Sequence, residues 1–366
     1  MSKHRNKPRQ ATTPSHDASR PPMRSSAPGT QPRPAQGVTR DAAPGRPVPE
    51  TISGRWLLRA LGLAILAAVL CAYLTLCLLF YQGQWQIVFH PSRSLTTTPA
   101  SLGLPYDDIR FDTTETGAPQ LDGWWIPADA VSADRTEHQG PTAQLSSLDA
   151  TRYGNSTILY LHGATGSLSD CAARLKTLHM LGINVFAIDY RGFGQSANVH
   201  PSENRVYQDA DAAWTYLTAT RHIDARSIVL YGEGLGATIA AETARRHPES
   251  PGLILDNPAP PAVDLIRADA RTSILPIRML FHDRFELLPI LASLGYVPDP
   301  PERRLLQGQR VQESLVVGQF TPQHTFQIAR RTAILTLYSQ QDASLDPHYP
   351  EALRRFLDEV LQARQP

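Results

Sequence analysis

The residues best suited to chemistry lie in the stretch SIVLYGEGLGATIAAE, residues 227–242. A β-branched apolar run ends in Gly232-Glu233-Gly234-Leu235-Gly236, and a helix of small residues is expected to follow. The strand–turn–helix pattern G-x-S-x-G presents a nucleophilic serine at the apex of such a turn. Here the apex residue is Gly234, which accepts the strained backbone of that turn but carries no hydroxyl. The spacing indicates nucleophilic chemistry on esters or amides, and the attacking atom is missing.

The elements that would position this turn alternate between strands and helices. The segments 106–114 and 121–127 alternate like an antiparallel hairpin, and five short apolar runs follow, at 156–163, 184–192, 227–232, 252–257 and 332–339. Helices are predicted between them, one opening near Glu203 with Ser202 as its N-cap, and a last one at 350–362. We therefore predict an α/β fold, a mostly parallel sheet with helices on both faces and its site beyond the carboxyl ends of the strands. Residues 258–331, rich in Pro and Arg, interrupt the alternation as a cap or insertion.

The N-terminal residues differ in composition from the rest of the chain. The first 50 residues hold 10 of the 31 prolines and no Leu, Ile, Phe, Tyr or Trp, so residues 1–54 are predicted to form a disordered Pro/Arg-rich tail. Residues 1–59 hold 11 Lys/Arg and 3 Asp/Glu, and the remainder is therefore acidic, with 24 basic and 31 acidic residues. An acidic main body gives no reason to expect nucleic-acid binding.

An uncharged run of 22 residues, Ala60 to Tyr81, follows the tail. It is long enough to cross a hydrocarbon core of about 30 Å, so residues 55–83 are predicted to be a transmembrane signal anchor. Arg55 and Arg59 flank its start, whereas only Arg93 lies close beyond its end. The positive-inside rule then predicts a single-pass protein whose N-terminus is cytoplasmic and whose main domain, residues 84–366, is extracytoplasmic.

The ordered set of motifs resembles the α/β-hydrolase superfamily, and within it the membrane-anchored branch described as lysophospholipase-like or serine-aminopeptidase-like. The pieces that carry the resemblance are FHPSR with LGLPYDDIRFDT, LDGWWIPA, LYLHGATGS, AIDYRGFGQSANVHPSE, YGEGLGATIA, GLILDNP, RMLFHDRFE and SQQDASLDP. They occur in that branch's order over roughly residues 86–350, with insertions near 128–155 and 287–322.

The resemblance implies roles for individual residues. The backbone N–H groups of Ala164 and Leu235 would form the oxyanion hole. His162 corresponds to a structural member of the loop before Ala164 rather than to the catalytic base. Asp342 matches the triad acid, with Asp346 as a fallback, and an equally open reading is that Asp342 makes turn hydrogen bonds only.

Two departures from the family pattern concern the catalytic triad. Gly234 leaves the nucleophile position vacant, Glu233 should point away from the site, and Thr238 lies a turn further along the helix. The triad order Ser–Asp–His requires a histidine after Asp342, on a loop that follows a further strand. The sequence has His348 there as a weak candidate base and then a helix, without the final His-bearing strand. The run 332–337 would then form an unprotected sheet edge.

Three hypotheses about function stay open. The first is a membrane-tethered pseudo-hydrolase that binds a lipid, ester, peptide or protein partner. The second is an active ester or amide hydrolase with a relocated nucleophile, and the third is a truncated, decayed hydrolase. No cofactor and no metal site is expected under any of them.

Overall fold

The computed structural model describes residues 53–112, 119–128, 153–268, 272–298, 300–307, 328–329, 332–338 and 349–362. Residues 1–52 of the predicted tail, the acid candidates Asp342 and Asp346, and His348 lie outside these residues, and α1 begins at Gly54, the last residue of the predicted tail. The sheet and the helices that cover it belong to one compact unit, Leu63–Pro366.

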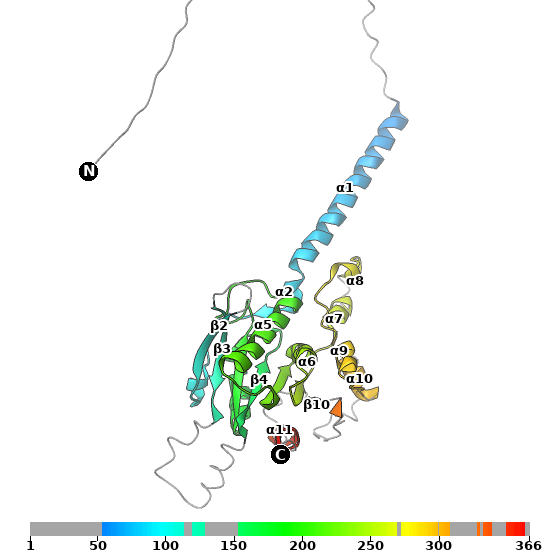
Figure 1. Ribbon diagram of the computed structural model, residues 1–366. Helices are drawn as coiled ribbons and strands as arrows, with labels where there is room; N and C mark the ends of the chain where they lie inside the picture. The colour runs from blue at the N-terminus through cyan, green and yellow to red at the C-terminus, as the bar shows by residue number, and fades with distance from the viewer. Residues whose placement is uncertain are drawn as a thin grey trace, which may run out of the picture. The chain divides into compact units, whose positions relative to one another are not determined.

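An eight-stranded sheet forms the centre of this unit, in the order β2-β3-β6-β4-β7-β8-β10-β9. The strands are β2 (Asp107–Asp112), β3 (Pro119–Ile126), β4 (Tyr153–Leu161), β6 (Ile183–Asp189), β7 (Ile228–Glu233), β8 (Gly252–Asp256), β9 (Ile328–Ala329) and β10 (Thr332–Leu337). The pairs from β6 to β10 are parallel, whereas β2–β3, β3–β6 and β9–β10 are antiparallel. Figure 1 shows β2 and β3 at one end of the sheet and β10 at the other. The predicted hairpin and five parallel runs are all present.

Helices cover both faces of the sheet because the central strands are apolar on both sides. Leu159 and Leu161 of β4 join the core that includes α5 (Glu203–Thr215) and α6 (Gly236–Arg246). Ile158 and Tyr160, which alternate with them, join the core that includes α4 (Leu168–His179) and α11 (Tyr349–Leu357). A further helical turn, η8 (Asp358–Gln362), continues from α11. The N-cap of α5 is as predicted, since Ser202 Oγ accepts the N–H of Arg205 at 3.4 Å.

The described part of residues 258–331 is largely helical. It contains α7 (Ala262–Ala268), α8 (Ile277–Leu280), α9 (Leu287–Ser293) and α10 (Pro300–Leu306). Phe281, Phe285, Leu287 and Leu291 are buried in the same core as α5 and α6. The predicted insertion therefore packs on this face of the sheet.

The edge of the sheet at β10 differs from the expectation of an unprotected strand. Ile328 and Ala329 of β9 pair with Ala333 and Thr332, so the first two residues of β10 are covered. The two-residue β9 has too few residues to show a strand period in the sequence.

A long apolar helix, α1 (Gly54–Gly83), precedes the sheet. An 18-residue window of α1 has a mean hydropathy of 2.7, and among the described residues it is the one helix long and apolar enough to span a membrane. A short helix α2 (Trp85–Val88) follows, and then β1 (His90–Pro91), which pairs in parallel with β5 (Thr165–Gly166). This small ladder ties the segment after α1 to the loop that follows β4.

Candidate functional site

Gly234 lies at the apex of the turn between β7 and α6, in a left-handed backbone conformation with φ of 56°. Its N–H donates to the carbonyl of Asp256 at 2.8 Å. Its own carbonyl accepts the N–H groups of Ala237 at 3.2 Å and Ala259 at 3.0 Å. The last residue of β8 and the chain just after it therefore hold the turn through backbone hydrogen bonds, without using any side chain at position 234.

The glycines on either side of the apex allow α6 to approach the sheet closely. A Cβ on Gly232 would lie 2.2 Å from the carbonyl oxygen of Gly236, and one on Gly236 would lie 2.1 Å from that of Leu161. These distances exclude any side chain at positions 232 and 236, so glycine at these two positions is a packing requirement of the turn.

The position of Gly234 itself is open. A Cβ built there meets nothing nearer than Gly163 Cα, at 3.9 Å, which is ordinary van der Waals contact. The loop after β4 thus faces the apex of the turn across the space that a side chain would occupy. The geometry has room for a nucleophile that the sequence does not supply.

The two predicted oxyanion donors have free backbone amides in this arrangement. Within the described residues, no hydrogen bond uses the N–H of Ala164 or that of Leu235. The carbonyl of Ala164 accepts the N–H of His90 at 2.8 Å, and Gly166 accepts that of Ser92 at 2.8 Å. The β1 segment therefore contacts the loop from its carbonyl side, and among the described residues the amide of Ala164 has no hydrogen-bond partner.

His162 is fully buried and takes part in the packing of the loop. Its Nδ1 lies 2.8 Å from the carbonyl oxygen of Gly163, and its Nε2 lies 3.4 Å from Asp189 Oδ1. Its ring packs against Tyr190 and Phe193, with centroids 4.5 and 5.0 Å apart. Asp189 Oδ1 also accepts the N–H of Leu168 at 3.0 Å. These contacts fit the structural role that the sequence indicated for His162.

The side chain of Glu233 joins a buried polar network behind the turn, as expected for a residue one position from the apex. It accepts a hydrogen bond from the Tyr160 hydroxyl and pairs with Arg174 Nε at 3.3 Å. Arg174 also pairs with Asp256, which accepts the hydroxyl of Tyr231. Burial is the main cause that raises the pKa of Tyr160 and Tyr231, so both hydroxyls stay protonated donors.

This network was not predicted from the sequence. Its members come from β4, α4, β7 and β8, and Tyr349 of α11 adds a hydroxyl contact to Tyr231. The sequence signal was a single arginine among the apolar positions of α4, where Arg174 is buried beside Ala172 and Leu175. The network links α4 and α11 to β4, β7 and β8 through side-chain contacts behind the turn.

Of the remaining candidate residues, the structure describes only Thr238. Thr238 is fully buried in α6, so a ligand in solution does not contact its hydroxyl. The structure does not describe Asp342, Asp346 or His348, and their roles stay predictions. No group of three His, Cys, Asp or Glu side chains that could hold a metal ion occurs among the described residues.

Comparison with known proteins shows which family model and which relatives this chain resembles. Residues 155–305 match the family model described as serine aminopeptidase, S33. The multifunctional-autoprocessing repeats-in-toxin protein of Vibrio vulnificus is 33% identical over 136 residues, which are 36% of this chain and 3% of the toxin. The uncharacterized protein Rv2307c of Mycobacterium tuberculosis is 25% identical over 238 residues, 65% of this chain and 75% of that protein.

Further similar proteins are named as an alpha/beta hydrolase domain-containing protein and as an esterase. The alpha/beta hydrolase domain-containing protein 17C of Homo sapiens is 31% identical over 145 residues, 39% of this chain and 41% of that protein. Among solved structures, the esterase Pf2001 of Pyrococcus furiosus superposes with a TM-score of 0.46 at 17% identity, over 75% of this chain and 98% of the esterase. The chain thus spans only a small part of the toxin and less than half of the human relative.

Proposed function

The chain belongs to the α/β-hydrolase superfamily, and from that premise we propose that it is a membrane-anchored pseudo-hydrolase. Its domain would bind a carbonyl-containing ligand, a lipid, an ester or a peptide, at the Gly234 turn. The anchor would be α1, with the N-terminus in the cytoplasm and the domain on the other side of the membrane. The turn would hold the ligand without forming an acyl-enzyme.

The observation that carries the proposal is Gly234 at the apex of an otherwise complete turn. The glycine spacing and the free amides of Ala164 and Leu235 suit the binding of a carbonyl oxygen. In a serine hydrolase, loss of the nucleophile alone lowers turnover by about 10⁶-fold, which leaves only the contribution of binding and of the oxyanion hole. A site with this geometry therefore favours binding over hydrolysis.

A fluorophosphonate probe tests the proposal directly because it reacts with activated serines. We expect no labelling of the purified full-length chain at any serine, with an active serine hydrolase as the positive control. Strong labelling of one serine, abolished by its replacement with alanine, would support a relocated nucleophile and overturn the proposal.

The variant Gly234→Ser supplies the missing hydroxyl in a position with room for it. We expect it to leave hydrolysis of p-nitrophenyl esters near the background rate. The reason is that His162, in the loop facing position 234, is buried and turns its nitrogens toward Gly163 and Asp189. Rapid turnover by this variant, absent from the matched Gly234→Ala protein, would mean that a base is already in place.

A further inference from the structure

The segment from Ile274 to His282 follows the last third of α1. The hydroxyl of Tyr73 donates to the carbonyl of Ile274 at 3.3 Å. Further along, Gln84 Oε1 accepts the N–H of His282 at 3.0 Å, and the rings of Tyr81 and His282 meet edge to face with centroids 5.0 Å apart. The segment around α8 therefore runs beside α1 in the same direction, from Tyr73 to Gln84.

This placement sets the depth of the segment in a membrane that α1 crosses. Tyr73 lies eight residues before Tyr81, where the apolar run ends, which corresponds to about 12 Å along the helix. Ile274 thus meets α1 at a level that belongs to the apolar run. Ile274 and Met279 are 64% and 82% exposed, so both large apolar side chains are available for contact with lipid. The acyl region of the bilayer would cover both.

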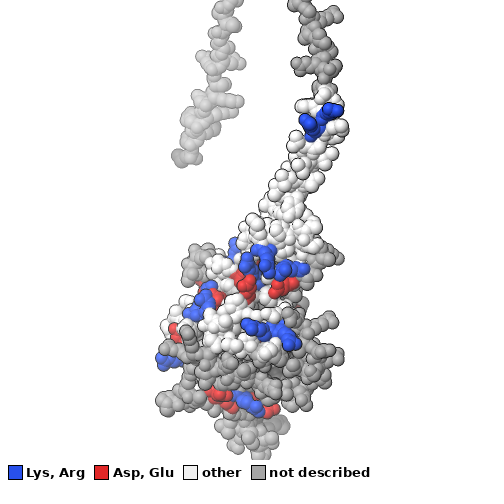
Figure 2. Space-filling model, turned by 90° about the vertical axis from the view of Figure 1, so that its right-hand side faces the viewer, with Lys and Arg blue, Asp and Glu red and all other residues white. Residues whose placement is uncertain are grey.

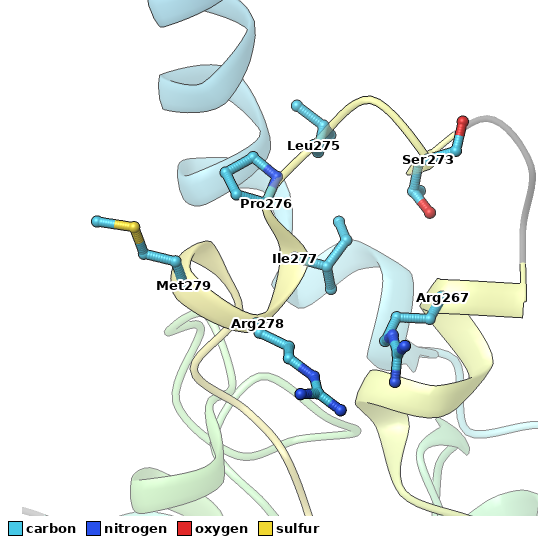
Figure 3. Close-up of a pocket in the computed structure, with 8 residues that line it drawn as sticks. Arg267, Ser273, Leu275, Pro276, Ile277, Arg278 and Met279 are labelled. Atoms are coloured by element: carbon cyan, nitrogen blue, oxygen red, sulfur yellow. The ribbon is translucent and has the colours of Figure 1, made fainter.

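A hollow of about 490 Å³ opens next to these two residues, between α7 and α8. Arg267 of α7 and Arg278 of α8 line it, together with Thr272 and Ser273. Figure 3 shows both guanidinium groups at the same end of the hollow, below Ile277, while Met279 points away from it. An exposed carboxylate, Asp264, lies 3.8 Å from Arg267, which is a weak contact at the surface.

The charges around the hollow suit a lipid headgroup. In Figure 2, Lys and Arg side chains lie on the domain just beyond the end of α1, with Asp and Glu side chains among them, whereas α1 itself is uncharged over most of its length. Two arginines that converge on one space bind a phosphate well, because each guanidinium can donate two parallel hydrogen bonds. The neighbouring apolar side chains continue from this space into the membrane.

We propose that the hollow between α7 and α8 binds the phosphate of an anionic phospholipid, with Arg267 and Arg278 on the phosphate and Ile274 and Met279 among the acyl chains. The inference rests on the proposed membrane anchoring of α1, and it is independent of whether the Gly234 turn is catalytic. Anionic lipid would thereby fix the α7–α8 segment against the membrane surface.

The test uses the full-length chain in nonionic detergent, with lipid retention measured by mass spectrometry of the intact protein. The probes are phosphatidylglycerol and phosphatidylcholine with identical acyl chains. We expect one phosphatidylglycerol molecule to bind more tightly than phosphatidylcholine. The double variant R267Q/R278Q should weaken that binding by about thirtyfold, because each arginine at a membrane surface contributes about a factor of five.

A matched control is R303Q/R304Q, which removes two exposed arginines from α10 and should leave lipid binding unchanged. The variant R267K/R278K keeps the charge without the planar donors and should retain part of the affinity, which separates lost binding from misfolding. Equal binding of the two lipids, or no effect of R267Q/R278Q, would overturn the proposal. Full displacement of phosphatidylglycerol by millimolar inorganic phosphate would also overturn it, in favour of a soluble anion. Extraction of the chain from membranes by alkaline carbonate would instead contradict the anchor.

Discussion

Among the described residues, Asp122 on β3 is a buried carboxyl group whose two oxygens both lack a hydrogen-bond donor. Neither of its carboxylate oxygens accepts a hydrogen bond within the described residues, and Arg110 Nε lies 3.5 Å away. Burial raises the pKa of Asp122 to about 7, with further contributions from Asp108 and Asp189 and an opposing one from Arg110. The folded chain therefore keeps a proton on Asp122 over a pH range in which the unfolded chain has lost it.

The free energy of unfolding therefore falls as pH rises from about 4 to about 7, because over this range the folded chain keeps a proton on Asp122 that the unfolded chain has lost. Asp122→Asn removes this dependence because an amide does not ionise. We expect the variant to match the parent near pH 4 and to exceed it by about 1–2 kcal/mol at pH 8. Thermal unfolding of the detergent-solubilised chain across this range measures the difference.

The control for this experiment is Asp107→Asn on the adjacent strand β2, where the side chain is 67% exposed. This variant removes one exposed carboxylate and should not reproduce the gain in stability of Asp122→Asn. A parent whose stability rises between pH 5 and pH 8, with no gain in Asp122→Asn, would contradict the assignment of the buried proton to Asp122.

At the scale of elements, the sequence predicted the strands well because each central strand is a short apolar run between turn residues. The hairpin of β2 and β3 followed from its alternation, and α5 from its period and its Ser202 cap. The helices α7 to α10 were predicted only as a cap, since their Pro- and Arg-rich sequence has no helical period. The ladders of β1 with β5 and of β9 with β10 involve two residue pairs each, which leaves no pattern to recognise.

For the candidate site, the glycine spacing correctly placed Gly234 and Leu235 on the turn between β7 and α6. Ala164 was assigned through the family resemblance, and the roles of all three residues in a site stay predictions. The Arg174 network escaped prediction, because its partners Asp256 and Glu233 come from strands far away in sequence. A contact between distant side chains depends on register, which no single segment reveals.

The close approach of α6 to β4 yields a prediction about Gly236. A Cβ there would lie 2.1 Å from the carbonyl oxygen of Leu161 and 2.5 Å from that of His162, and backbone atoms do not yield as a side chain would. We expect Gly236→Ala to lower the free energy of unfolding by about 3 kcal/mol. The Cβ of Gly234→Ala would make only ordinary van der Waals contacts. We expect this variant to lower the free energy of unfolding by about 1–2 kcal/mol, because alanine is strained at the positive φ of this position.

Chemical denaturation of the two variants beside the parent measures both values. The order of the two losses is the informative result, because sequence alone treats both positions as turn glycines. A Gly236→Ala chain as stable as Gly234→Ala would mean that α6 does not approach β4 as closely as the structure has it.

At the scale of the whole molecule, the proposed membrane anchor α1 lies close in sequence to the loop of the candidate site. The segment after α1 pairs with the loop that carries Ala164, through His90 and Ser92. The helix that would hold the chain in the membrane is thus followed within a few residues by β1, the strand that pairs with the loop containing Ala164. A ligand drawn from the membrane would meet the α7–α8 segment and the Gly234 turn on the same domain.

The orientation of this anchor is open to a direct test. Arg55 and Arg59 precede the apolar run, and charge asymmetry of this kind keeps the basic end in the cytoplasm. In a background without Cys71, Cys77 and Cys171, a cysteine is placed either at Ser53 or at Ser293, both exposed. A membrane-impermeant maleimide added to intact cells should label Ser293→Cys at once, and Ser53→Cys only after permeabilisation. The reverse pattern would place the domain in the cytoplasm, where its ligand would have to come from the inner leaflet. Replacing Arg55 and Arg59 with glutamine should weaken the preference for a cytoplasmic N-terminus, because those charges would no longer oppose translocation of the N-terminus.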